Sequence, residues 1–435
     1  MQNQSAAIPC LLISWSRTRQ RRSPRSDFFM HILVLDTIHG GKMISEAFLS
    51  RGDQVDLVDV YRGESAVDVN TALSRKYDLI VAPVHLDPDH PLLEHARAPV
   101  ITHHEAVRQL LGEDLPDPMV EITGFRGKTT TAHALASLMP GKGILHTSMG
   151  TFRFPEKNWI SRSSITPGSV LAAVRRAREI HGWLIVEESL GVTGAGTLAI
   201  ITSDEDYFFA AGKKCAIKAK VSSAMHCRHL LLADHIQADY QDGIVHIEDV
   251  ASCKGTECTM NLDGKSFRIT NPLLALPAYH DSLMLAATAA VMLGIDPSTL
   301  ASFAALTGRM SVSYKEDVLV VDNANSGTNF ITTIDAARYA RSTSGHQDIT
   351  LVIGQQEGDG AVCEGFAHDQ ILAAVETIHP VHLIWVGRFP DPGTEEYRSL
   401  GPRVTAHVPT LEAGYAIAKQ KTERGSIVLA VKIWR

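Results

Sequence analysis

The chain has 435 residues, more than one hydrophobic core usually organises, so two or three domains are expected. Apolar residues make up 45% and charged residues 20%, which excludes a disordered chain, and 48 acidic against 41 basic residues argue against a nucleic-acid partner. The sequence contains no apolar run of about eighteen residues, so we expect neither a membrane span nor a membrane partner.

Residues 1–29 differ in character from the rest of the chain. They carry several arginines and place their short apolar patch before these charges, the reverse of the order in a signal peptide. The segment MHILVLDTIHGG, which begins at Met30, is typical of a buried strand followed by a glycine loop. We therefore expect Met30 to be the true start and residues 1–29 to be an upstream extension of the gene model. A disordered basic arm is the alternative.

Residues 30–117 alternate strand and helix patterns and predict a small parallel sheet with a nucleotide-fold architecture. Its glycines do not form GxGxxG, so no dinucleotide is expected. The prolines Pro116 and Pro118 indicate a linker that ends the unit. The strands are expected at 31–36, 54–60 and 77–83, with a helix after Gly40 and Gly41.

Two further α/β units come next, at 118–272 and 273–435. In the second unit, strands are expected at 120–123, 183–187 and 198–202, with a helix over 169–180. In the third unit, a helix is expected over 281–293 and strands at 318–322, 349–353 and 382–386.

The strongest chemical signal is VEITGFRGKTTTAHALASLM, a β-branched strand that leads through a glycine loop into a helix. Glycines let backbone amides converge on phosphate oxygens, and the helix N-terminus favours negative charge. Lys128 would bridge the terminal phosphates, and Thr129 or Thr130 would ligate Mg²⁺. We therefore predict a phosphate-binding loop of Gly124, Phe125, Arg126, Gly127, Lys128, Thr129 and Thr130.

The six cysteines include no CxxC pair and indicate no disulfide framework, which suits a reducing cytoplasm. The spacing of Cys253 and Cys258 could be half of a metal site. We interpret the two instead as ordinary thiols in a turn and expect no metal cluster held by the protein.

The phosphate loop is shorter than the standard GxxxxGK, whose first glycine would fall at Ile122. It resembles the TGxxGKTTT loop of the Mur ligases and the folylpolyglutamate synthetases. This resemblance implies an α/β chain with a three-domain Mur ligase architecture, in which a central P-loop ATPase domain lies between Rossmann-like domains. It also implies a cytoplasmic enzyme that uses ATP and Mg²⁺ to activate a carboxylate as an acyl phosphate.

In that family a carboxylate at a strand end of the central domain holds Mg²⁺. The segment LIVEESLG offers Glu187 for this role, with Glu188 beside it, and strand alternation lets only one of them face the phosphates. A solvated strand end is the alternative interpretation of this acidic pair. Asp204 and Asp206 lie near the family's next acidic position, but its aspartate–histidine pair is absent, so a second metal ligand there is doubtful.

The family's carbamylated lysine has its nearest match in Lys220, with Lys218 second, although an ordinary surface lysine is the alternative. The segment ALPAYHDSLMLAA resembles the stretch that brackets adenine, with His280 in the histidine position. LTGRM supplies Arg309, whose family counterpart reaches the terminal phosphate. In VVDNANSGTNF, Asp322 matches a ribose-binding aspartate. The resemblance thus assigns catalytic roles to Lys128, Glu187, Lys220 and Arg309.

The segments TIHGGKM, LVDVYRG, SMGTF, SSITPGSVL and VEESLGVTGAG together resemble the archaeal coenzyme F(430) synthetase family from Met30 onward. This resemblance implies ATP-dependent closure of a carbocyclic ring, which converts 15,17(3)-seco-F(430)-17(3)-acid to coenzyme F(430). Nickel then belongs to the tetrapyrrole substrate. We expect a monomer or a weak homo-oligomer.

Two other classes stay open, namely an amide ligase that joins an amino acid to a carboxylate and a P-loop NTPase without ligase chemistry. NKxD and DxxG motifs are absent from the sequence, which argues against a GTPase, and a non-catalytic carrier would not need the third-domain matches. His39, on the first glycine loop, is a candidate for substrate contact, with an ordinary hydrogen-bonded loop histidine as the alternative. The residues do not identify the base that would deprotonate a carbon nucleophile.

Overall fold

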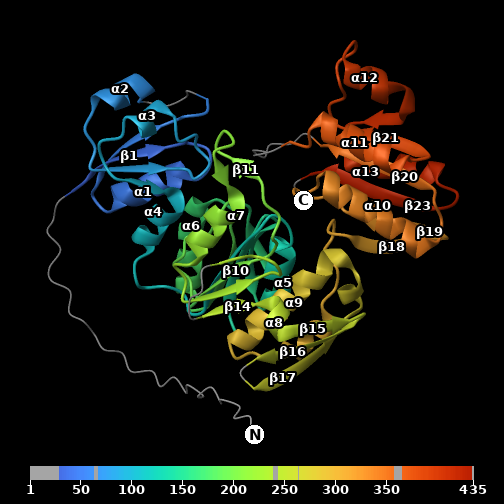
Figure 1. Ribbon diagram of the computed structural model, residues 1–435, viewed down its shortest axis with the longest axis horizontal. Helices are drawn as coiled ribbons and strands as arrows, with labels where there is room; N and C mark the ends of the chain where they lie inside the picture. The colour runs from blue at the N-terminus through green and yellow to red at the C-terminus, as the bar shows by residue number, and fades with distance from the viewer. Residues whose placement is uncertain (1–28, 63–66, 239–242, 263, 357–364, 434–435) are drawn as a thin grey trace, which may run out of the picture.

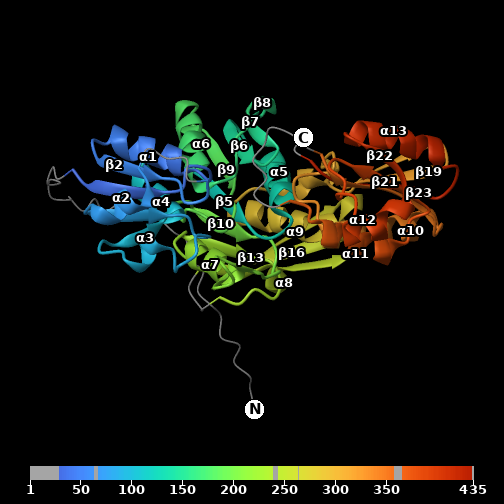
Figure 2. The same ribbon diagram turned by 90° about the horizontal axis from the view of Figure 1, so that it is seen from above.

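The computed structural model describes residues 29–62, 67–238, 243–262, 264–356 and 365–433. Nearly the whole of the proposed 1–29 extension lies outside these residues. Three α/β units succeed one another along the chain, and the central unit lies between the first and the third (Figures 1 and 2).

The first unit is the parallel sheet that the sequence predicts, in the order β2-β1-β3-β4. Apolar residues fill its centre because β1 and β3 are buried on both faces, as in other parallel sheets. Its elements are β1 His31–Leu35, α1 Gly41–Ser50, β2 Gln54–Val58, α2 Val69–Ser74, β3 Leu79–Ala82, α3 Pro91–Glu94, β4 Val100–Thr102 and α4 His103–Leu111.

The second unit contains an 8-stranded sheet in the order β14-β13-β10-β5-β9-β6-β7-β8. Its strands from β14 to β6 pair in parallel, whereas β7 and β8 add an antiparallel edge that the sequence analysis did not predict. The strands are β5 Met119–Thr123, β6 Gly143–Thr147, β7 Gly150–Phe154, β8 Asn158–Ser161, β9 Trp183–Glu187, β10 Leu198–Ile201, β13 His229–Leu232 and β14 Ile244–His246. The helices are α5 Lys128–Leu138, α6 Pro167–Glu179, α7 Ala216–Ala224 and α8 Ile247–Val250, and a small hairpin is formed by β11 Phe208–Phe209 and β12 Lys214–Cys215.

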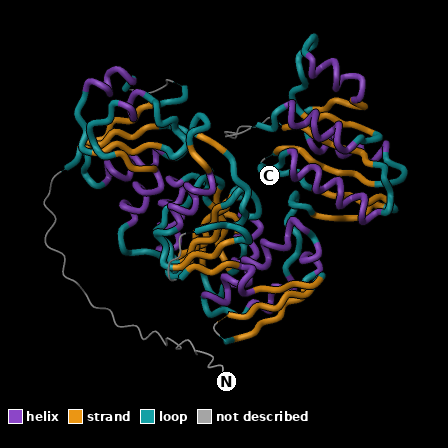
Figure 3. The backbone as a smooth tube through the Cα atoms, viewed as in Figure 1, coloured by secondary structure: helices purple, strands orange, loops and turns teal. Residues whose placement is uncertain are grey.

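A 3-stranded antiparallel sheet lies at the edge of this central unit (Figure 3). It consists of β15 Ala251–Lys254, β16 Glu257–Leu262 and β17 Lys265–Thr270. The next segments along the chain are η1 Pro272–Ala275, α9 Pro277–Met292 and η2 Pro297–Ser302.

The third unit is a 6-stranded sheet in the order β18-β19-β23-β20-β21-β22. It contains β18 Ser311–Lys315, β19 Val318–Asp322, α10 Phe330–Ser344, β20 Ile349–Gln355, α11 His368–Ile378, β21 His382–Val386, α12 Glu395–Leu400, η3 Gly401–Arg403, β22 Val404–Val408, α13 Leu411–Lys421 and β23 Ser426–Lys432.

The third sheet begins near residue 311, whereas the sequence predicts that the third unit begins at 273. Helix α9 explains the difference, because it packs on α5, β13 and β16 of the central unit. Almost every side chain in its middle is buried, since it is covered on more than one side. Helix α9 thus connects the two units but belongs to the central core.

The pair Cys253 and Cys258 corrects a second expectation. These residues lie opposite each other on β15 and β16 and form a disulfide, with their Cα atoms 4.0 Å apart. The turn consists of Gly255 and Thr256 between them, so the expectation of two thiols in a turn was wrong. A spacing of five residues around a two-residue turn places two side chains directly across a hairpin.

Candidate active site

The phosphate loop takes the predicted form, with β5 before it and α5 after it. Gly124 and Gly127 have φ values of 152° and 82°, which favour glycine. A Cβ on Gly124 would also collide with the Thr202 hydroxyl at the end of β10. Ser203 accepts hydrogen bonds from the amides of Phe125 and Arg126 at 3.0 and 3.3 Å. The loop is therefore fixed by the neighbouring strand.

Lys128 begins α5, and its side chain turns back over the loop. Its ammonium donates to the carbonyl oxygens of Gly124 and Phe125 at 3.1 and 3.4 Å. Burial lowers the pKa of Lys128, an effect that nearby Glu187 opposes and Arg309 reinforces. Burial also lowers the pKa of Arg309, whereas Glu187 raises it. Two half-buried cations near one carboxylate leave a net positive site that suits a polyphosphate.

Glu187 ends β9 and is 2% exposed. One of its carboxylate oxygens accepts hydrogen bonds from the Thr129 hydroxyl at 2.8 Å and from the Ser148 amide at 3.0 Å. The structure thus brings together Thr129 and Glu187, the two residues expected to hold Mg²⁺. Their hard oxygen atoms are ligands that Mg²⁺ prefers, and a buried carboxylate gains from a cation beside it.

Glu188 points to the other face of the sheet. Burial raises its pKa well above the usual range, and nearby Glu121 adds to the effect. Glu121 is itself held by the amide of Gly196 at 2.8 Å and by the hydroxyl of Thr193. Strand alternation therefore separates a carboxylate at the phosphate loop from a second carboxyl group buried within the fold.

Arg309 lies between η2 and β18, where the chain passes from the central unit to the third. Its guanidinium donates to the Ser148 hydroxyl at 3.1 Å. Asn325, after β19, donates to the carbonyl of Gly308 at 2.7 Å and so holds the arginine segment from the side of the third unit. The predicted arginine is therefore placed beside the phosphate loop.

These groups line one cavity of about 780 Å³ between the central and third units. Its size is in the range of small-molecule sites. The cavity collects the following predicted residues: Phe125, Arg126, Gly127, Lys128, Thr129, Thr130, Glu187 and Arg309. It also collects residues that received no role in the sequence analysis: Ser148, Ser164, Thr166, Ser189, Asn323, Asn325, Asn329 and Gln356. All of these residues except Gln356 belong to segments that carried the family resemblance, and this was their only signal.

Besides Gly124 of the phosphate loop, three predicted residues lie outside the lining of this cavity. His280 faces the Cys253 and Cys258 hairpin, although its neighbours Asp281 and Ser282 line the cavity. Asp322 precedes the lining residue Asn323 and accepts a hydrogen bond from the amide of Ala324 at 3.1 Å. Their expected contacts with adenine and ribose stay predictions.

Lys220, the third such residue, lies on α7 and is 1% exposed. Its ammonium has no hydrogen-bond partner among the described residues and lies 5.2 Å from the centre of the Tyr207 ring. Burial lowers the pKa of Lys220 to about 8, and the charge of Lys128 adds to the effect. Lys218 is exposed. Of the two candidates, Lys220 is therefore the one with a reactive, partly neutral amine.

Asp206 binds the start of α7 and does not line the cavity. Its carboxylate accepts hydrogen bonds from the amides of Tyr207 and Ile217 at 2.8 and 3.0 Å and from the thiol of Cys215 at 2.8 Å. Asp206 therefore has a local structural role at the start of α7.

A histidine cluster marks the first unit. The His39 ring lies 3.1 Å from the Asp36 carboxylate, and its centre is 4.7 Å from that of His85, which stacks on Tyr61. These residues come after β1, β2 and β3, at the edge where α/β sheets bind ligands. Gly40 packs so closely on Gly168 that a side chain there would clash. The histidine loop therefore touches the 162–169 segment, part of which lines the cavity.

Comparisons with known proteins relate this chain to others by sequence and by fold. Residues 312–433 match the family described as coenzyme F430 synthetase CfbE, C-terminal domain. The coenzyme F(430) synthetase of Methanosarcina acetivorans is 29% identical over 94% of this chain and 99% of its own. The chain is therefore similar to the coenzyme F(430) synthetases over nearly the whole of its length.

The fold of the chain is that of the Mur ligases. MurF from Acinetobacter baumannii aligns with a TM-score of 0.51 and 15% identity, over 86% of each chain. Escherichia coli FolC, solved in complex with ADP, aligns with a TM-score of 0.53 and 13% identity, over 76% of this chain and 90% of its own. At these identities the likeness concerns the fold. No helix in the described part of the chain is long and apolar enough to cross a membrane.

Proposed function

We propose that this chain is an ATP-dependent ligase that closes a carbocyclic ring of a nickel tetrapyrrole. It would convert 15,17(3)-seco-F(430)-17(3)-acid to coenzyme F(430), with release of ADP and phosphate. One observation supports the ligase chemistry: Lys128, Arg309 and the Thr129–Glu187 pair lie in one cavity. The relative from Methanosarcina acetivorans supports the choice of substrate, and the ADP bound to FolC supports the nucleotide.

The phosphate loop would hold the ATP phosphates through its amides, with Lys128 and Arg309 at the terminal group. Thr129 and Glu187 would hold Mg²⁺, which neutralises phosphate charge during transfer. The substrate carboxylate attacks the γ-phosphorus, the bond from phosphorus to the β-bridging oxygen breaks, and ADP leaves. The product of this step is an acyl phosphate.

Ring closure then takes place on the same substrate molecule. A base removes a proton from a carbon next to the activated chain, and that carbon attacks the acyl carbon. The new carbon–carbon bond forms as the bond from carbon to the phosphate oxygen breaks and phosphate leaves. Because both reacting groups belong to one macrocycle, no amine has to be bound, and intramolecularity can supply an effective molarity of about 10⁵ M or more.

Lys220 would act on the nucleotide as a carbamate. A neutral amine is required for reaction with CO₂, and the pKa of about 8 gives Lys220 a larger neutral fraction at neutral pH than an ordinary lysine has. The reaction joins the nitrogen to the CO₂ carbon and releases one proton. The resulting anion would lie on the side of Lys128 and would supply a further ligand for Mg²⁺.

The deciding experiment supplies purified enzyme with ATP, Mg²⁺ and the nickel seco-acid, without any amine. We expect the tetrapyrrole to lose the mass of one water, with a changed absorption spectrum and one ADP for each product. A protein that stays inert until an amino acid is added would instead be an amide ligase. ATP hydrolysis that is independent of either substrate would indicate an NTPase without ligase chemistry.

A further inference from the structure

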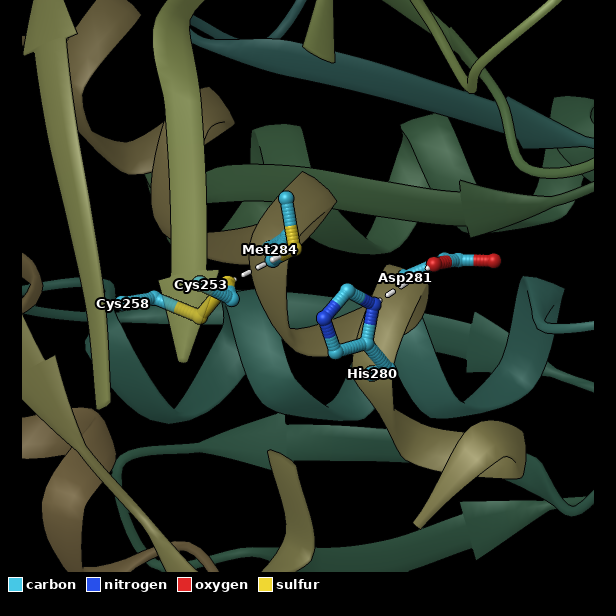
Figure 4. The surroundings of a disulfide bond; sticks show 5 residues. All are labelled: Cys253, Cys258, His280, Asp281 and Met284. Carbon is cyan, nitrogen blue, oxygen red and sulfur yellow. Dashed lines mark hydrogen bonds and ion pairs between the residues drawn. A yellow bond between two sulfur atoms is a disulfide. The ribbon is translucent and has the colours of Figure 1, made fainter. Parts of the chain in front are cut away.

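Outside the nucleotide cavity, a cluster of soft side chains lies between β15, β16 and the start of α9 (Figure 4). Cys253 and Cys258 point inward from adjacent strands, and His280 faces them from the helix. The two sulfur atoms and a ring nitrogen of His280 all lie within 4.8 Å of one another. The Met284 sulfur, one helical turn beyond His280, lies 3.0 Å from the Cys253 sulfur.

His280 is oriented as metal-binding histidines usually are. Its Nδ1 atom lies 2.8 Å from the Asp281 carboxylate, which leaves Nε2 on the side of the sulfur atoms (Figure 4). A carboxylate on the far nitrogen fixes the ring and strengthens the near nitrogen as a ligand. His280 is absent from the lining of the nucleotide cavity.

We propose that Cys253, Cys258 and His280 form a binding site for a thiophilic divalent cation of the zinc type. Two thiolates and one imidazole are a ligand set that Zn²⁺ favours, and three protein ligands leave one tetrahedral position for a small molecule. Reduction of the disulfide frees the two sulfur atoms to move apart to the roughly 3.5 to 4 Å that separates ligand atoms in a tetrahedral zinc site. The assignment is independent of the cyclase reaction.

The site is formed by the dithiol state of the hairpin. A thiol reductant converts the disulfide to two cysteine thiols and is itself oxidised to a disulfide. Binding of the cation then releases both thiol protons to the solvent, because thiolates are the ligands. Only the two cysteine side chains need to rotate, since their strands already hold them opposite each other.

Nearby acidic groups favour a cation. Asp234 comes after β13, and its pKa is raised by burial and by the charges of Glu248 and Asp281. One Asp234 oxygen is buried without a hydrogen-bond partner among the described residues. A bound cation would also fix the hairpin to the first turn of α9, which lines the nucleotide cavity.

The test uses untagged full-length protein, reduced without oxygen by a phosphine and freed of metal with a chelator. We expect the wild type to bind one equivalent of Co²⁺ more than the Cys253→Ser/Cys258→Ser variant does. The bound cobalt should show a thiolate-to-cobalt charge-transfer band. Zn²⁺ should displace the cobalt and raise the Tm of the wild type but not that of the double variant. Cys215→Ser, which removes a thiol outside the cluster, is the matched control and should bind as the wild type does.

His280→Gln keeps both thiols and tests the site if the double variant fails to fold. We expect it to weaken Zn²⁺ binding by at least about tenfold, and Asp281→Asn to weaken it by about 10- to 100-fold. Three results would each overturn the site: equal cobalt binding by wild type and double variant, a cobalt spectrum without the thiolate band, or undiminished affinity in His280→Gln. If the bond between Cys253 and Cys258 resists the reductant, the pair is a structural disulfide and the proposed cation site does not form.

Discussion

Thr129 and Glu187 are joined by a hydrogen bond of 2.8 Å between the first turn of α5 and the end of β9. Glu188, the next residue, lies on the opposite face beside Glu121. Because only Glu187 faces the phosphate loop, Glu187→Gln should raise the Mg²⁺ concentration needed for half-maximal activity by at least about tenfold. Titration of activity with Mg²⁺ at saturating ATP measures this. Glu188→Gln is the matched control, and an equal effect in both variants would remove Glu187 from the metal site.

Glu188→Gln also has an effect on stability. The pKa of Glu188 is raised by burial, so the folded state keeps its proton at pH values where the unfolded chain has lost it. Its contribution to stability is fully present below the unfolded pKa of about 4.5 and falls as pH rises toward the folded pKa. A glutamine cannot lose a proton, so the variant should lose less stability than wild type as the pH rises above the unfolded pKa of Glu188. Urea unfolding at several pH values provides the measurement, and parallel curves for the two proteins would contradict the expectation.

Lys128→Ala should abolish turnover and leave the fold intact. The Lys128 ammonium contacts only loop carbonyls in the described structure, so folding does not depend on an ion pair there. Loss of charge stabilisation at the transferred phosphate commonly costs about 10² in kcat or more. Circular dichroism and ADP release measure the two effects, with Lys142→Ala at an exposed position as control. Wild-type turnover in folded Lys128→Ala would disprove the assignment of the loop.

Much of this arrangement could be predicted from local sequence. The strand, glycine loop and helix around Lys128 are set by residue type alone, and the bounds of β9, β19 and β21 agree with the expected strands. Long-range packing decided the rest. The hydrophobic pattern of α9 does not say which unit buries it, and the position of Cys253 opposite Cys258 depends on a hairpin register. Likewise, the choice between Lys220 and Lys218 depends on which face of α7 is buried.

Lys220 should make activity depend on CO₂. Burial lowers its pKa to about 8, so the neutral amine that reacts with CO₂ becomes more abundant as pH rises through this value. Enzyme depleted of CO₂ should lose activity and regain it with bicarbonate, faster at higher pH. Lys220→Ala should be inactive and should not respond to bicarbonate, whereas Lys218→Ala, at an exposed position, should behave as wild type. Activity unaffected by CO₂ removal would leave Lys220 without a carbamate.

The histidine cluster of the first unit should control the tetrapyrrole and not the nucleotide. His39 and His85 lie at the carboxyl ends of the first-unit strands, and the His39 loop touches the 162–169 segment through Gly40 and Gly168. Burial lowers the pKa of His85 to about 4, so this ring is neutral at neutral pH and offers a nitrogen lone pair to the substrate. His39→Gln and His85→Gln should therefore raise the KM for the nickel seco-acid by about tenfold, which corresponds to about 1.4 kcal/mol of binding free energy, and leave the KM for ATP unchanged.

The control is His95→Gln, which changes an exposed histidine of the same unit. If KM for ATP rose together with that for the tetrapyrrole, the cluster would be acting through the fold. If kcat alone fell and both KM values stayed constant, one of the two rings would be the base that the ring closure requires.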